Sequence, residues 1–182
     1  MLTLPPTGPH ITFLLGGARS GKSRIGEELV SQAMGTRLYV ATAEARDMEM
    51  SARIEHHQAR RGADWVLIEE PVELARVLTR DLTSDHLVLV DCLTLWLNNL
   101  MERDVDLVRA TDELVAALAA TKGRIVLISN EVGQGIVPDN ALARRFRDEA
   151  GFLHQKIATA SDQVAFIVAG LPLILKENTR RP

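Results

Sequence analysis

The sequence predicts an α/β protein built on a mostly parallel, doubly wound sheet. Short, nearly continuous apolar runs such as LVLV (87–90) and IVLIS (125–129) alternate with longer amphipathic segments. Uninterrupted hydrophobic strands are typical of a parallel sheet that is covered on both faces. The alternation of strand and helix patterns then favours the doubly wound arrangement.

The expected strands are β-branched apolar runs bounded by turn residues. Six of them are Ile11–Leu15, Arg37–Ala41, Trp65–Ile68, Leu87–Val90, Ile125–Ser129 and Val164–Val168. A seventh strand, Leu173–Lys176, follows Gly170-Leu171-Pro172, a turn signal that predicts a C-terminal hairpin.

Helical periodicity fills the intervals between these runs. It predicts helices over 22–34, 46–61, 71–81, 93–119 and 139–160, with the fourth broken near Asp104. Pro71 suits the first turn of its helix, and Asp139 is the expected cap of the last one. Trp96 and its neighbouring asparagines could face either the core or a partner subunit.

Length and composition narrow the class of protein. With 182 residues and no repeat or linker, the chain is predicted to be one domain over 11–182 after a loose leader, 1–10. The net charge of −3 offers no attraction to nucleic acid or anionic membrane. One cysteine cannot form an internal disulfide, and no apolar stretch approaches the roughly 18 residues that span a bilayer. A cytoplasmic enzyme or binding domain is expected.

A glycine-rich turn between the first strand and the first helix matches G-x-x-x-x-G-K-[ST], the P-loop pattern. Its backbone N–H groups and the following helix N-terminus suit phosphate oxygens, whereas the alternative is a turn without a ligand. Lys22 would reach the β- and γ-phosphates, and the Ser23 hydroxyl would bind Mg²⁺. The predicted nucleotide-binding residues of this turn are Gly16, Gly17, Ala18, Arg19, Ser20, Gly21, Lys22 and Ser23.

A P-loop also needs an acidic residue at the end of a neighbouring strand to hold Mg²⁺. Asp91 ends the strand HLVLVD, at the carboxyl edge where open α/β sheets place their ligands. Its alternative role is to cap the next helix, and Glu131 is a weaker second candidate for the metal.

The segment DMEMSARIEHHQARR (47–61) gathers unusual polar groups on one expected helix face. Glu49, Arg53, His56 or His57, and Arg60 recur at spacings of three and four. A solvated charged face is one explanation. The other is a catalytic histidine, since neutral imidazole is nucleophilic near pH 7 and arginine binds phosphate bidentately.

These motifs together resemble a known family, the bifunctional adenosylcobinamide kinase/adenosylcobinamide-phosphate guanylyltransferases of cobalamin biosynthesis. The resemblance runs from about Ile11 to Lys176. It is carried by GGARSGKS, YVATAEARDMEMSARIEHHQARR, VLVDCLTLWLNNLM and SNEVGQGIVPDNALARRFRDEAGFLHQKIA. The RI-x-HH and NEVG-x-GIVP segments are more restrictive than the P-loop.

The resemblance implies a RecA-like P-loop fold, a homotrimer and two reactions. ATP or GTP would phosphorylate adenosylcobinamide, and GMP from GTP would then pass through a histidine to that phosphate, giving adenosylcobinamide-GDP and pyrophosphate. By motif position the guanylylated residue is His56. The implied further nucleotide contacts are Ala41, Thr42, Ala43, His57, Gln58, Ala59, Arg60, Glu69 and Asp91.

Three other interpretations remain open at this point. One is a small-molecule P-loop kinase without guanylyl transfer, with both histidines as bystanders. Another is a nucleic-acid motor or regulatory switch, which the net charge and the small number of aromatic residues (four Phe, two Trp, one Tyr) disfavour. The third is a nucleotide-binding subunit without turnover. The glycine-rich loop Asn130–Pro138 either helps to hold substrate or nucleotide or is purely structural.

Overall fold

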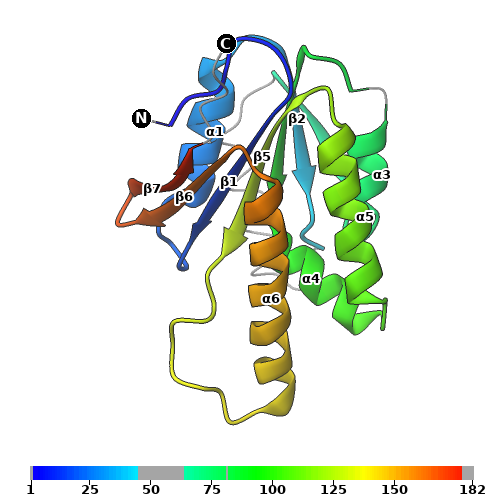
Figure 1. Ribbon diagram of the computed structural model, residues 1–182, viewed down its shortest axis with the longest axis vertical. Helices are drawn as coiled ribbons and strands as arrows, with labels where there is room; N and C mark the ends of the chain where they lie inside the picture. The colour runs from blue at the N-terminus through cyan, green and yellow to red at the C-terminus, as the bar shows by residue number, and fades with distance from the viewer. Residues whose placement is uncertain (1, 45–63, 81, 178–182) are drawn as a thin grey trace.

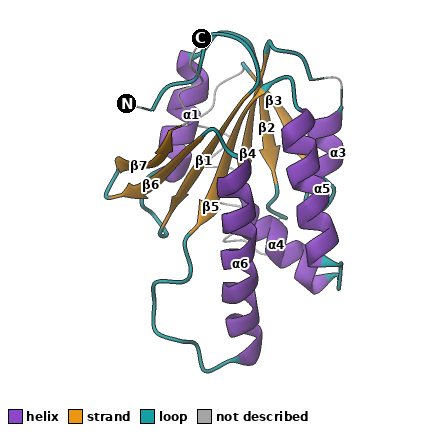
Figure 2. Ribbon diagram, viewed as in Figure 1, coloured by secondary structure: helices purple, strands orange, loops and turns teal. Residues whose placement is uncertain are grey.

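A computed structural model describes residues 2–44, 64–80 and 82–177. Within these residues, seven strands form one sheet in the order β3-β2-β4-β5-β1-β6-β7 (Figures 1 and 2). The neighbours are parallel except for β6 and β7, which are antiparallel, so the predicted fold class is confirmed. The strands are β1 His10–Gly16, β2 Thr36–Ala41, β3 Trp65–Glu69, β4 His86–Asp91, β5 Arg124–Asn130, β6 Gln163–Val168 and β7 Leu171–Glu177.

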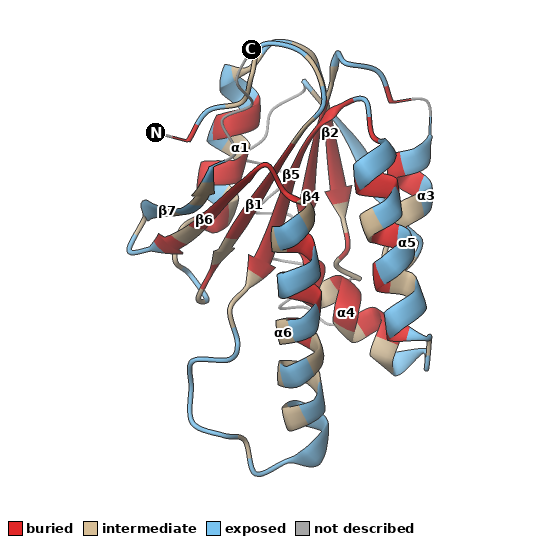
Figure 3. Cartoon of the chain, in the orientation of Figure 1, coloured by how far each residue is buried: buried red, intermediate tan, exposed pale blue. Residues whose placement is uncertain are grey.

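Helices cover both faces of the sheet, as the hydrophobic strands require. Helix α1 packs on one face, and the other four described helices pack on the opposite face (Figure 1). The central strands are buried along most of their length (Figure 3). The described helices are α1 Lys22–Gln32, α3 Leu74–Thr79, α4 Leu93–Glu102, α5 Leu107–Ala120 and α6 Ala141–Ala160.

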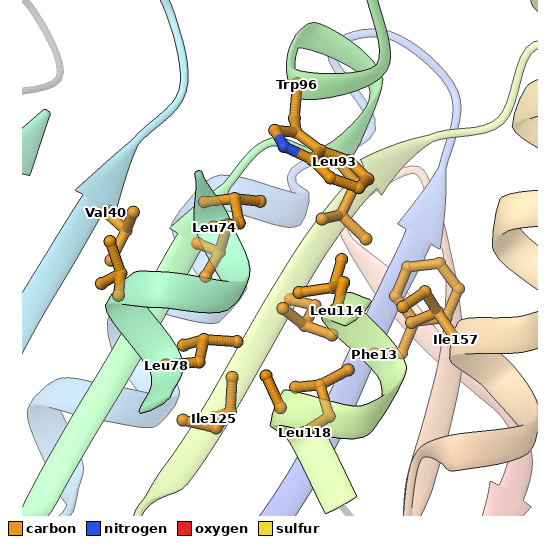
Figure 4. Packing of buried hydrophobic residues seen from close by; sticks show 14 of the residues in the cluster. Phe13, Val40, Leu74, Leu78, Leu93, Trp96, Leu114, Leu118, Ile125 and Ile157 are labelled. Atoms are coloured by element: carbon orange, nitrogen blue, oxygen red, sulfur yellow. The ribbon is translucent and has the colours of Figure 1, made fainter. Parts of the chain in front are cut away.

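The larger core lies between the sheet and the four helices α3 to α6. Side chains from strands and helices interdigitate there, with Phe13, Leu114 and Ile157 fully buried (Figure 4). Trp96 belongs to this core: it is 2% exposed, and its indole N–H donates to the Val72 carbonyl at 2.6 Å. No helix in the described part of the chain is long and apolar enough to cross a membrane.

Two expected helix starts are wrong by a few residues. Helix α3 begins at Leu74 instead of Pro71, because the Glu70 carboxylate accepts the N–H groups of Val72 and Glu73 and forms a separate turn there. Asn140, and not Asp139, caps α6, since its side chain accepts the N–H groups of Leu142 and Ala143. The predicted break near Asp104 is confirmed between α4 and α5.

The C-terminal hairpin is confirmed, but its turn lies one residue earlier than the sequence signal. Ala169 and Gly170 form the turn with φ of 52° and 79°. Two consecutive positive φ angles are the mark of a tight hairpin turn whose twist matches the strands. Pro172 therefore sits inside β7, which tolerates proline because it is an edge strand.

The segment before β1 is attached to the sheet rather than loose. Leu2 is buried, and the Arg124 guanidinium donates to the carbonyl oxygens of Pro5 and Pro6 at 3.1 and 3.0 Å. Arg124 also donates to the Met34 carbonyl at 2.7 Å, which ties α1 to the same point. An arginine with 1% exposure is tolerated here because backbone carbonyls accept hydrogen bonds from both terminal nitrogens of its guanidinium, although its buried Nε has no hydrogen-bond partner in the described structure.

Candidate active site

The parallel register brings several predicted site residues to one edge of the sheet. Ala41 pairs with Asp91 on one side and with Glu69 on the other, so the three stand at the same level on β2, β4 and β3. Gly16, at the end of β1, pairs with Asn130 on β5. The carboxyl ends of these strands therefore form the rim from which the P-loop leaves.

The P-loop is a tight turn in which Gly16 and Gly21 are required by the backbone geometry, whereas Gly17 has open space around it. A Cβ on Gly16 would lie 2.4 Å from the Ile167 carbonyl oxygen, closer than any side chain tolerates. The Ser20 N–H donates to the Gly17 carbonyl at 3.2 Å, and Gly21, the N-cap of α1, has a φ of 99°. No side chain caps this helix, so its first N–H groups face the loop without an intrahelical acceptor.

Lys22 is buried at the base of this loop. Its ammonium group donates to the Gly17 carbonyl at 2.7 Å and to the Ser20 hydroxyl at 3.5 Å. Burial lowers the pKa of Lys22, while the nearby Asp91 carboxylate opposes that shift. A desolvated cation in a tight loop near a carboxylate is suited to pairing with an incoming anion.

Asp91 is oriented by a residue that the sequence did not point to. The Tyr39 hydroxyl donates to Asp91 Oδ2 at 3.2 Å, and the Tyr39 ring meets the Trp65 ring edge-on with centroids 6.2 Å apart. Tyr39 faces Leu89 in the β2–β4 register, two residues before Asp91, which sets both on the same face of the sheet. Only the strand pairing reveals this partner.

Thr42, one of the implied nucleotide contacts, has its side chain fully engaged inside the protein. Its hydroxyl donates to the Cys92 carbonyl and accepts the Cys92 N–H, both at 2.8 Å. The Thr42 carbonyl accepts a hydrogen bond from the buried Asn99 side chain at 2.8 Å. The residue therefore ties the end of β2 to the segment after β4. Glu69, by contrast, is exposed at the rim.

Cys92 is a structural thiol. Burial raises its pKa to about 11, and the neighbouring Asp91 charge acts in the same direction. Its sulfur lies 3.1 Å from the Thr94 hydroxyl, which also accepts the Asn130 amide at 3.0 Å. A neutral, enclosed thiol is a poor nucleophile at physiological pH.

The loop after β5 is organised by its own polar groups. The Glu131 N–H donates to the Gly16 carbonyl at 2.9 Å, while its carboxylate accepts the Gly133 N–H. Arg144 fixes the far end by donating to the carbonyls of Pro138 and Asp139. The Glu131 carboxylate is thus bonded within its own loop, and Ile136 is exposed.

The histidine segment lies outside the described residues, so the expected helix 46–61 is not placed. The predicted site residues that fall there are His56, His57, Gln58, Ala59 and Arg60. The described chain next to it is anchored: Glu44 pairs with Arg103 at 2.6 Å, and Arg37 with Asp64 at 3.7 Å.

The sheet order and the P-loop define a RecA-like P-loop nucleotide-dependent protein. Two solved structures share this fold. One is the flagellar accessory protein FlaH of Methanocaldococcus jannaschii (TM-score 0.50, 14% identity, 93% of this chain and 80% of that one). The other is a prototypical ATPase of the type III secretion system of pathogenic bacteria (TM-score 0.58, 15% identity, 93% and 57%).

The particular family follows from closer comparisons. Residues 12–175 match the family described as cobinamide kinase / cobinamide phosphate guanyltransferase, and the chain belongs to it. It is 50% identical over 167 residues to the bifunctional adenosylcobalamin biosynthesis protein CobP of Pseudomonas aeruginosa, covering 90% of this chain and 96% of the relative. It is 42% identical over 179 residues to CobU of Salmonella typhimurium, with 90% and 98% covered. The resemblance in the sequence is thereby confirmed, and the chain is a bifunctional kinase and guanylyltransferase.

Proposed function

We propose that one P-loop serves both reactions, by holding the triphosphate of ATP or GTP between the Lys22 ammonium and the N-terminus of α1. The observation that carries this is the loop itself: an uncapped helix start, a buried lysine and the Asp91 carboxylate meet at the carboxyl edge. An incoming phosphate would replace the Gly17 carbonyl as the partner of Lys22. Such an exchange of one partner for another keeps the buried charge compensated.

In the kinase step the hydroxyl oxygen of the adenosylcobinamide aminopropanol arm attacks the γ-phosphorus. A new P–O bond forms, the bond to the β-phosphate breaks, and the hydroxyl proton passes to solvent. The protein supplies position and charge: Lys22 and the helix N-terminus stabilise negative charge on the phosphate oxygens. Adenosylcobinamide phosphate and a nucleoside diphosphate result.

Mg²⁺ fits the oxygen donors that this edge provides. The Ser23 hydroxyl and the Asp91 carboxylate are hard ligands, and the hydrogen bond from Tyr39 leaves the second oxygen of Asp91 for a cation or its water. When bound, the ion neutralises charge on the β- and γ-phosphates. Among the described residues no group of three acidic, histidine or cysteine side chains forms a separate metal site.

In the guanylyl step a nitrogen of the His56 imidazole attacks the α-phosphorus of GTP. An N–P bond forms, the bond to the β-phosphate breaks and pyrophosphate leaves. An oxygen of adenosylcobinamide phosphate then attacks the same phosphorus, frees the imidazole and gives adenosylcobinamide-GDP. The motif position of His56 supports this assignment. His57, Gln58, Ala59 and Arg60 would complete the nucleotide contacts, with the Arg60 guanidinium suited to phosphate.

Labelled GTP tests the covalent step directly. Incubation with GTP labelled at the α-phosphate, followed by denaturing electrophoresis, should leave label on the protein, whereas a γ-phosphate label should not be retained. The adduct should be acid-labile and alkali-stable, because protonating a phosphoramidate nitrogen makes imidazole a good leaving group. A protein that phosphorylates cobinamide but never retains the α-label would be the kinase-only alternative.

The resemblance further supports a homotrimer, and the single cysteine supports a reducing compartment such as the cytoplasm. Sedimentation at micromolar concentration would test the assembly, because a monomer and a trimer of a 20.0 kDa chain separate clearly. Cell fractionation would test the location.

A further inference from the structure

The tip of the C-terminal hairpin touches the phosphate-binding loop directly. The Gly170 N–H, in the turn between β6 and β7, donates to the Ser20 carbonyl oxygen at 2.8 Å. Ser20 is a residue of the P-loop, near the opposite end of the chain. A backbone hydrogen bond therefore connects the last hairpin to the loop that precedes α1.

The contact is also steric, and it involves both ends of the P-loop. A Cβ on Gly21 would lie 3.2 Å from Gly170 Cα, so these two glycines pack backbone against backbone. Gly16, at the other end, lies against the Ile167 carbonyl of β6. The loop is thus seated on the β6–β7 hairpin through backbone contacts, with the Arg24 guanidinium beside them, 3.4 Å from the position that a Cβ on Gly170 would take.

The hydrogen bond to Ser20 orients a peptide group as well as fixing a distance. In a trans peptide the C=O and the following N–H point in opposite directions. Because the Ser20 carbonyl points at the hairpin, the Gly21 N–H points away from it. Gly21 is also the N-cap of α1, where free N–H groups and the helix dipole favour anions.

We propose that Gly170 is a positioning residue for both reactions: its N–H holds the Ser20–Gly21 peptide so that the Gly21 N–H is aimed at a phosphate oxygen of the nucleotide. The proposal rests on the P-loop being the nucleotide site, as proposed above. The hydrogen bond from the Gly21 N–H to the phosphate would be present in both the bound ground state and the transition state. Its loss therefore raises KM and leaves kcat nearly unchanged.

A single-atom change tests this role. Replacing Gly170 by glycolic acid, through nonsense suppression, exchanges the amide N–H for an ester oxygen and keeps the flexible backbone of glycine. The matched control places the hydroxy-acid analogue of leucine at Leu171, whose N–H closes a turn of this length. Each ester removes one hydrogen bond of the same hairpin, but only the first removes the bond to Ser20.

We expect the Gly170 ester to bind a fluorescent GTP analogue about tenfold more weakly, with the Leu171 ester within about twofold of wild type. The KM for ATP in the kinase assay and for GTP in guanylyl transfer should rise by the same factor. Equal affinities for the two esters, at any level, overturn the proposal. Lys22→Ala, measured in the same assay, distinguishes failure of the P-loop assignment from failure of the positioning role. If Lys22→Ala binds the analogue normally, the P-loop is not the nucleotide site. If Lys22→Ala binds weakly and the Gly170 ester binds normally, only the positioning role is wrong.

Discussion

The Tyr39 hydroxyl donates a hydrogen bond to Asp91 Oδ2 at 3.2 Å, across the neighbouring strands β2 and β4. The bond uses one oxygen of a carboxylate that stands at the ligand edge of the sheet. It fixes the rotation of the carboxylate, and with it the direction in which the second oxygen faces.

Tyr39→Phe should raise the Mg²⁺ concentration needed for half-maximal kinase activity by about tenfold, because partners that orient a metal ligand have effects of this size. Phenylalanine keeps the ring contact with Trp65, so the fold is preserved. The measurement is a Mg²⁺ titration at saturating ATP, together with Mg²⁺-dependent thermal stabilisation of the nucleotide complex. An unchanged titration in this variant would show that Asp91 does not serve the metal.

Lys22→Ala should impair both reactions by on the order of a hundredfold, as for removal of one charge-stabilising donor. Phosphorylation of cobinamide and retention of the α-label from GTP are the two assays. Lys122→Ala, at an exposed lysine remote from the P-loop in sequence, is the control and should keep both activities. Near-normal phosphorylation by the Lys22 variant would refute its assigned role.

His56→Ala should separate the two activities. Without the imidazole no phosphoramidate forms, so the α-label and guanylyl transfer are lost while γ-phosphoryl transfer from ATP persists. His57→Ala should weaken nucleotide handling and still take the label. A labelled His56 variant beside an unlabelled His57 variant would reverse the choice within the pair, and two labelled variants would exclude both histidines.

Asn140→Ala should lower the free energy of unfolding by about 1 kcal/mol, because two N–H groups at the start of α6 lose their acceptor. Asp139→Ala, one residue earlier, is the matched control and should change stability by less than about 0.5 kcal/mol. Urea denaturation of both variants measures the difference. Equal losses of unfolding free energy in the two variants would contradict the assignment of Asn140 as the cap.

Acid should destabilise the protein through His154. Burial lowers the pKa of this histidine from 6.5 to about 4, partly opposed by Glu131, and its Nε2 lies 2.8 Å from the Ser129 hydroxyl. Because the folded pKa is below the unfolded one, the unfolded state takes up the proton first. The contribution of His154 to the free energy of unfolding is therefore fully present above pH 6.5 and is lost as the pH drops toward 4.

Lowering the pH from 7.5 to 5 should therefore reduce the free energy of unfolding by about 2 kcal/mol through this histidine alone. The variant Ser129→Ala/His154→Leu removes both partners, so no polar group is left unpaired. Denaturation curves at the two pH values give the drop in unfolding free energy on acidification. In the double variant this drop should be about 2 kcal/mol smaller than in the wild type. The same acid loss in both proteins would mean that other groups are responsible.

The phosphate-binding loop was predictable from the sequence because its signal is local: glycines, lysine and serine at fixed spacing between a strand and a helix. Asp91 was predictable because it ends a hydrophobic run. Tyr39 was not, since its link to Asp91 depends on strand register. Nor was the internal use of the Thr42 hydroxyl, whose partner Cys92 lies 50 residues away.

The predicted helix boundaries were wrong where side chains form hydrogen bonds with backbone groups near the helix start. Pro71 is compatible with a helix start, yet the Glu70 carboxylate organises the turn before α3. Asp139 and Asn140 have similar capping propensities, so their order could not be decided from residue type. The hairpin contact between Gly170 and Ser20 carries no sequence signal, because it joins two backbones.

The position of β1 in the sheet has a consequence for the order in which the protein folds. The strand lies between β5 and β6, and the Ile11 N–H at its start bonds to Asp162, 151 residues later. Contacts of such long range form slowly. The P-loop leaves the end of β1, so its first residue gains both neighbouring strands only once β5 and β6 have joined the sheet. We therefore expect the P-loop to reach its final shape late in folding.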